Sequence, residues 1–170
     1  ALEQAFHGDT FGAMSVSGLS VYNGPFEDFL LQVDRIEVPT QTNVEQVKTR
    51  FEKLLKTGEV AAFIFEPLVQ GAAAMNMYEA SLLDELIAMA RKHQVLCIAD
   101  EVMTGFGKTG KNFASEYLKN SPDILCLSKS LTGGLVPMAL TSCTQAIFDA
   151  FYDDALGKGF FHGHTYSANP

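Results

Sequence analysis

Three short apolar runs stand out in the pattern of hydrophobic and polar positions along the chain. They cover residues 60–66, 95–100 and 124–129, and each run closes on a charged residue. Apolar runs of this length, bounded by turn residues, are typical of strands buried in a parallel sheet. A further strand is expected at residues 137–142. The pattern therefore predicts a sheet whose strands each deliver a charged or polar side chain to one end.

Amphipathic stretches occur between these runs and predict helices. Residues 42–58 carry apolar positions three and four apart, with a capping box formed by Thr42 and Glu45 at the start and Gly58 at the end. A second strong helix is expected at residues 82–90, between two of the strands. Strand, helix and strand in this order predict parallel pairing through a crossover. The remaining expectations are short helices at residues 10–18, 112–118 and 145–152, and a loop at residues 19–41.

These elements define the fold class as α/β, a mostly parallel sheet with flanking helices. The 170 residues are enough for one domain with a real core. The net charge of −8 and the absence of a Lys/Arg cluster argue against a nucleic-acid partner. No segment is long and apolar enough for a membrane span, and the first residues lack the pattern of a signal peptide, so a cytoplasmic location is expected.

An acid and an amine close two of the apolar runs, Asp100 and Lys129. The carboxyl ends of parallel strands meet at the sheet edge where ligands bind. A lysine that forms a Schiff base and an acid that keeps a pyridine nitrogen protonated are the two groups that a pyridoxal phosphate (PLP) enzyme needs. The simpler alternatives are that Asp100 caps a turn and that Lys129 only reaches solvent.

Neighbouring residues refine this hypothesis. Asp100 and Glu101 are adjacent in an extended segment, so only one of them can face a ligand. Val102 would lie on the same side as Asp100 and could pack on the face of a bound ring. Glu66, at the end of the first run, either orients a polar group near a cofactor or bonds to backbone.

Two other kinds of site are less consistent with the sequence. Residues 105–110 match G-x-G-x-x-G, but four residues separate them from the preceding strand. The next acid, Asp123, begins a strand instead of ending one, so a dinucleotide site is not expected. The histidines lack further ligands at workable spacing, so no metal site is expected. The three cysteines are expected to be small buried residues in a reducing compartment, namely Cys97, Cys126 and Cys143.

The whole chain resembles the class III PLP-dependent aminotransferases of fold type I. The matching stretches occur in the family's order: FHGDT at residues 6–10, FEP with QG at 65–71, IADEV with TGFG at 98–107, LSK with LTGG at 127–134, and HGHT at 162–165. Together these stretches are highly specific, although each alone is weak. The alternatives are a class III enzyme for ornithine, γ-aminobutyrate or a related amine, and a non-catalytic PLP-binding domain.

The resemblance implies roles for individual residues. Lys129 would form the Schiff base and move the proton, Asp100 would pair with the ring nitrogen, and Val102 would pack on the ring. Phe6, where the most similar members usually have tyrosine, would stack near the ring and contact substrate. The other implied site residues are His7 and Glu66 near the cofactor, Gly163 in the substrate pocket, and His164 and Thr165, which reach the phosphate from a neighbouring subunit.

The resemblance also implies how much of the enzyme the chain represents. Residues 1–170 are expected to be a fragment of the large PLP-binding domain of a homodimer with its site at the interface. The family's phosphate-binding loop would precede residue 1, and its small domain with a carboxylate-binding arginine would follow residue 170. A small-molecule amino donor and a keto acceptor are the expected partners.

Overall fold

Four strands form the central sheet of a computed structural model, which describes residues 1–163. The strands are β1 (Ala62–Phe65), β4 (Leu96–Asp100), β5 (Ile124–Leu127) and β6 (Leu140–Cys143), in the spatial order β1-β4-β5-β6. β1, β4 and β5 pair in parallel, with Phe65 opposite Ala99 and Asp100 opposite Cys126. β6 runs antiparallel to β5. The α/β class and the mostly parallel sheet are confirmed.

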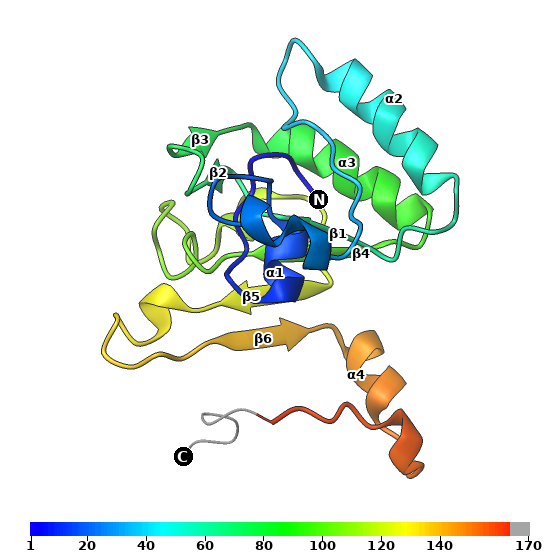
Figure 1. Cartoon of the computed structure of the whole chain (residues 1–170), viewed down its shortest axis with the longest axis vertical. Coiled ribbons are helices and arrows are strands. Elements are labelled where there is room, and N and C mark those ends of the chain that lie inside the picture. Colours follow the sequence, from blue (N-terminus) through cyan, green and yellow to red (C-terminus); the bar gives the residue numbers. More distant parts are fainter. Residues whose placement is uncertain (164–170) are drawn as a thin grey trace.

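Two amphipathic helices, α2 (Val44–Leu55) and α3 (Ala80–Lys92), lie side by side and pack against the sheet (Figure 1). α3 connects β1 to β4, as the strand–helix–strand pattern predicts. The shorter helices are α1 (Phe11–Val16) and α4 (Gln145–Phe151). The 3₁₀ segments are η1 (Gly24–Phe29), η2 (Ala114–Tyr117), η3 (Lys129–Leu131) and η4 (Leu156–Lys158).

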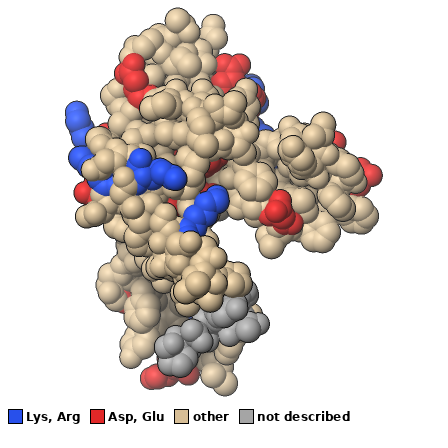
Figure 2. All heavy atoms as spheres, turned by 90° about the vertical axis from the view of Figure 1, so that its left-hand side faces the viewer, with Lys and Arg blue, Asp and Glu red and all other residues tan. Residues whose placement is uncertain are grey.

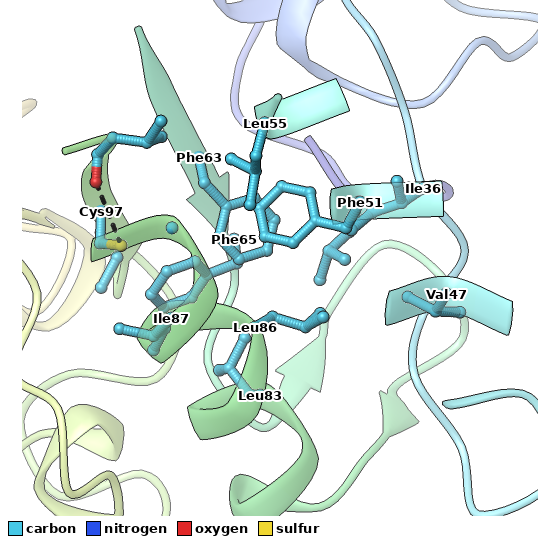
Figure 3. Packing of buried hydrophobic residues seen from close by; sticks show 14 residues of the cluster. Ile36, Val47, Phe51, Leu55, Phe63, Phe65, Leu83, Leu86, Ile87 and Cys97 are labelled. Atoms are coloured by element: carbon cyan, nitrogen blue, oxygen red, sulfur yellow. Dashed lines mark hydrogen bonds between the residues drawn. The ribbon is translucent and has the colours of Figure 1, made fainter. Parts of the chain in front are cut away.

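The hydrophobic core lies between α2, α3 and the sheet (Figure 3). Three phenylalanines form its centre: the Phe63 ring centroid lies 4.9 Å from that of Phe51 and 5.2 Å from that of Phe65. Leu83, Leu86 and their neighbours on α3 are fully buried against these rings. Aromatic pairs at such distances add to the stabilisation from buried area. The core therefore holds β1 and β4 in the register that places their carboxyl ends together.

The C-terminal part of the chain is far less covered. All four residues of β6 are exposed, and so are Phe148 and Phe151 on α4. Figure 2 shows this part projecting below the main body. No helix in the described part of the chain is long and apolar enough to span a membrane.

Some expectations about local structure are wrong. Thr42 and Glu45 form no capping box on α2, because Asn43 is the N-cap and its Oδ1 atom accepts hydrogen bonds from the backbone and hydroxyl of Thr40. The expected loop at residues 19–41 contains the 3₁₀ segment η1. A small antiparallel pair, β2 (Val69–Gln70) and β3 (Asn76–Met77), lies between β1 and α3, where no strand was predicted.

The cysteines differ from the expectation that all three are buried. Cys97, on β4, is buried in the core, but Cys126, on β5, is only half-buried and Cys143 is exposed at the end of β6. Cys143 is exposed for the same reason as the rest of β6, because no described element covers that strand. Burial raises the pKa of the Cys97 thiol to about 12, which makes this side chain an inert packing residue.

Replacing Leu86 by alanine is expected to lower the free energy of unfolding by about 2–5 kcal/mol, because the side chain is completely buried and its removal leaves a cavity in the core. Urea unfolding measures this loss. The matched control is Leu96→Ala on β4, where the side chain is 39% exposed and the expected loss is smaller. Equal losses in the two variants would contradict the assignment of the core.

Candidate active site

The carboxyl ends of β1, β4 and β5 surround one pocket of about 370 Å³. This volume lies within the range of small-molecule sites. It forms here because residues that follow parallel strands leave the sheet at the same edge. The pocket is lined by Phe6, His7, Gly8, Glu66, Gly71, Ala72, Met75, Asp100, Val102, Met103 and Lys129.

Asp100 is the last residue of β4, and its carboxylate is held at both oxygens. The backbone N–H of Val102 donates to Oδ1 at 3.1 Å, and Nδ1 of His7 lies 2.7 Å from Oδ2. The side chains of His7 and Asp100 are 2% and 8% exposed. Each carboxylate oxygen can accept more than one hydrogen bond, so the acid keeps acceptor capacity for a ligand in the pocket.

Glu101 points away from this pocket, as the alternation along an extended chain predicts. Its buried carboxylate accepts hydrogen bonds from the Thr104 hydroxyl at 3.1 Å and from the backbone N–H groups of Ala114 and Ser115 at 2.6 and 2.8 Å. These contacts bring the start of η2 to the turn that follows β4. The two adjacent acids therefore separate into one that faces the pocket and one that anchors a loop.

Glu66 connects two segments that line the pocket, the one that contains Phe6 and the one that contains Gly71. Its Oε1 atom accepts from the backbone N–H of Phe6 at 3.0 Å, and its Oε2 atom accepts from the backbone N–H of Gly71 at 2.9 Å. Burial raises the pKa of the Glu66 carboxyl, and the two backbone hydrogen bonds oppose this rise only in part. Of the two roles considered from the sequence, the contacts seen are those of a residue that bonds to backbone.

Lys129 begins the 3₁₀ segment η3, one residue after Ser128, which follows β5 directly. Its side chain is exposed, and its Nζ atom forms no hydrogen bond or ion pair with any described residue. Lys129 lines the same pocket as Asp100. The pocket is therefore lined by a carboxyl group with two hydrogen-bond contacts and by a lysine whose amine has none among the described residues.

The structure brings together six of the residues selected from the sequence: Phe6, His7, Glu66, Asp100, Val102 and Lys129. Gly163 is exposed and does not line the pocket formed by the described residues, while His164 and Thr165 lie outside those residues. Gly71 and Ala72 also line the pocket but were not among the site residues selected from the sequence. Met75 and Met103 were missed, because isolated methionines carry no signal of their own.

The G-x-G-x-x-G stretch forms turns after β4. Gly105 donates its N–H to the carbonyl of Glu101, and Gly107 donates to that of Asn112. Helical structure resumes only at η2, several residues later, so the stretch does not open a helix. The geometry of a dinucleotide site, in which the glycines lead directly into a helix, is not found here.

Comparisons with known proteins identify the family. A model of the family Aminotransferase class-III matches residues 1–170. The chain is 46% identical, over 178 residues, to adenosylmethionine-8-amino-7-oxononanoate aminotransferase from Synechococcus elongatus, covering 100% of this chain and 42% of that relative. The chain therefore belongs to the class III aminotransferase family.

Solved structures support the same fold. The enzyme of the same name from Methanocaldococcus jannaschii superposes with a TM-score of 0.85 at 35% identity, covering 97% of this chain and 39% of that chain. A PLP-bound amine transaminase from an uncultivated Pseudomonas species superposes with a TM-score of 0.88 at 31% identity. The match covers 97% of this chain and 40% of that chain. The chain thus spans about two fifths of the length of these relatives.

Replacing Glu66 by glutamine is expected to lower the free energy of unfolding, and the loss relative to wild type should become smaller as the pH rises. The variant loses one acceptor for the two backbone N–H groups, which costs about 1–3 kcal/mol. However, the pKa of Glu66 lies above its ordinary value of 4.5, so the folded state holds the proton more tightly than the unfolded state. The free energy of unfolding of the wild type therefore falls as the pH rises from the ordinary pKa of a glutamate to the raised pKa of Glu66. Glutamine does not titrate, so the variant lacks this pH dependence. Urea unfolding across this range measures the effect, and parallel pH profiles would contradict it.

Proposed function

We propose that this chain forms the cofactor-binding part of a PLP-dependent aminotransferase. The observation that carries the proposal is one pocket lined by both Asp100 and Lys129. The carboxylate of Asp100 is held at both oxygens, and the amine of Lys129 has no partner among the described residues. Membership of the class III family and the PLP-bound structural relative support the same cofactor.

The residues present fit this cofactor. Asp100 retains acceptor capacity for a protonated ring nitrogen, and Lys129 supplies the amine that would hold the cofactor covalently. Val102 and Phe6 provide apolar surfaces for a flat aromatic ring. The phosphate contacts from His164 and Thr165, and from a loop before residue 1, stay predictions.

The chemistry follows from what each side chain can do. When bound, the cofactor takes up the electrons released at the substrate α-carbon. The Asp100 carboxylate would hold the ring nitrogen of this group protonated. The Lys129 Nζ atom would hold the group covalently and would take up the proton released at the substrate α-carbon.

For the substrates, we propose that the amino group moves from S-adenosylmethionine to 8-amino-7-oxononanoate and gives 7,8-diaminononanoate for biotin synthesis. Relatives with this name from several bacteria match nearly the whole chain. The stretches that resemble this enzyme are HGDTFGAMSV at residues 7–16, PLVQGA at 67–72 and DEVMTGFG at 100–107. The alternative donor is ornithine, γ-aminobutyrate or a related amine, because an ornithine aminotransferase also matches the fold.

We further propose that residues 1–170 belong to the large domain of a longer protein that forms a homodimer in the cytoplasm. The length of the relatives supports this, and so does the exposed apolar surface at the C-terminal part. This surface includes Leu135, Leu140, Phe148, Phe151, Phe160 and Phe161. A non-catalytic domain is disfavoured because the lysine and the acid are both retained.

Replacing Lys129 by alanine in the longer protein is expected to lower the transamination rate by about 100- to 10,000-fold, because the proton-transfer group is lost. The variant is also expected to lose the visible absorbance of covalently held PLP. The matched control is Lys92→Ala at the exposed end of α3, which should leave rate and spectrum unchanged. A Lys129→Ala protein that keeps the wild-type spectrum would refute the proposal.

The amino donor is tested by single-turnover spectroscopy of the PLP-loaded protein. We expect S-adenosylmethionine to bleach the visible band of the bound cofactor and ornithine to leave it unchanged. The opposite result would leave the cofactor assignment in place and overturn the substrate assignment.

A further inference from the structure

We propose that Ser128 is a positioning residue for Lys129, because its hydroxyl group fixes the backbone from which the reactive amine extends. This inference rests on the proposed function and adds a role for a side chain that neither the family match nor the names of the relatives assign. It starts from a hydrogen bond across the connection between β5 and β6 (Figure 1), in which Oγ of Ser128 donates to the carbonyl of Met138 at 2.9 Å.

Ser128 occupies the point at which the chain leaves the sheet. The ladder between β5 and β6 ends at the pair Leu127 and Leu140, and Ser128 is the next residue after β5. Its hydroxyl therefore continues the pairing by one contact beyond the last strand residues. On the other side, the Ser128 carbonyl accepts from the N–H of Leu131 at 2.6 Å and closes the turn of η3. Ser128 is thus held at its side chain and at its carbonyl.

The connection between β5 and β6 is also closed within itself. The Thr132 hydroxyl donates to the carbonyl of Val136 at 2.8 Å, which brings the two halves of the connection together. The bond from Ser128 to Met138 then joins its two ends. A loop that is closed at its base and at its middle has fewer accessible conformations, so the residues inside it are held in place.

The position of the Lys129 amine depends on this backbone anchor. The Lys129 side chain is exposed, and its Nζ atom has no hydrogen bond or ion pair with any described residue. The place of the amine in the pocket is therefore set by the backbone that directly follows Ser128. All four residues of β6 are exposed, so hydrophobic packing on that strand contributes little to holding the loop. The hydroxyl bond is the contact that ties the start of η3 to β6.

Covalent attachment of PLP is the step that requires this placement. The unprotonated Nζ atom adds to the aldehyde carbon of the cofactor, a C=N bond forms, and the aldehyde oxygen leaves as water with the two amine protons. If the loop is not joined at its base, ordering it costs part of the free energy of this attachment. The pocket residues Asp100 and Val102 belong to β4 and the turn after it, so contacts with the ring do not depend on the loop.

Affinity for two ligands tests this role. The apo form of the longer protein is titrated with PLP and with pyridoxine phosphate, which carries an alcohol in place of the aldehyde and cannot attach to a lysine. Ser128→Ala is expected to weaken PLP binding by about three- to tenfold, as for loss of a hydrogen bond between neutral groups. The same variant should change the affinity for pyridoxine phosphate by less than about twofold, since that compound makes no use of the amine.

Three further variants complete the experiment. Ser128→Thr and Ser128→Val have nearly the same shape, but only the first keeps a hydroxyl. The threonine variant should keep the wild-type preference for PLP over pyridoxine phosphate, and the valine variant should lose it to the same extent as Ser128→Ala. The matched control is Ser130→Ala on the other side of Lys129, where the exposed hydroxyl has no hydrogen bond with a described residue. This control should change neither affinity.

Each outcome is decisive. Equal losses for the two ligands would show that Ser128 only supports the fold of the loop, and unchanged PLP affinity would show that Lys129 does not need it. Should Ser128→Ala fail to fold, a folded Ser128→Thr protein that has lost the preference for PLP would overturn the proposal equally. If wild-type protein develops no visible band with PLP, the proposed function fails instead.

Discussion

Parallel pairing of β1, β4 and β5 is the constraint on which the site depends. The register places Phe65 opposite Ala99 and Asp100 opposite Cys126, so the residues that follow each strand leave the sheet at one edge. Glu66, Asp100 and Lys129 share a pocket for this reason alone. A shift of one residue in β4 would turn Asp100 to the other face of the sheet, because side chains alternate along a strand.

Because side chains alternate along a strand, the two adjacent carboxylates at the end of β4 make different contacts. Asp100 faces the pocket and is engaged by His7 and Val102, whereas Glu101 is buried on the other side and holds the start of η2. A buried acid is tolerated only where hydrogen bonds replace its hydration, and each of these acids has them. The loop that carries Met103 into the pocket is thus fixed from behind by the neighbour of the functional acid.

Much of the fold follows from periodicity. Strands β1, β4 and β5 and helix α3 are long or apolar enough to be predicted, and their ends identify Glu66, Asp100 and Lys129. The N-terminus of α2 was predicted wrongly, because Thr40 and Asn43 satisfy each other in a local turn that competes with a capping box. The β2–β3 pair has too few residues for any period to be read.

The contact between His7 and Asp100 could not be predicted in the same way. The two residues are far apart in the chain, and FHG at residues 6–8 is compatible with stacking, loop packing or hydrogen bonding. Only the three-dimensional approach of the N-terminal segment to the edge of β4 selects among these. A site residue that directly follows a strand can be predicted from the sequence. A contact between two segments that are far apart in the chain cannot be predicted in this way.

The acid and the amine differ in burial and in hydrogen bonding, and the difference matches the tasks proposed for them. An electrostatic partner for a ring nitrogen works best when it is already oriented, since no reorganisation is then needed during the reaction. Asp100 is buried and has two donors. A group that carries a proton between two atoms must instead change position, and Lys129 lies on an exposed 3₁₀ turn with no described partner. The buried, doubly held carboxyl group and the exposed amine without a described partner are therefore suited to different tasks in the same pocket.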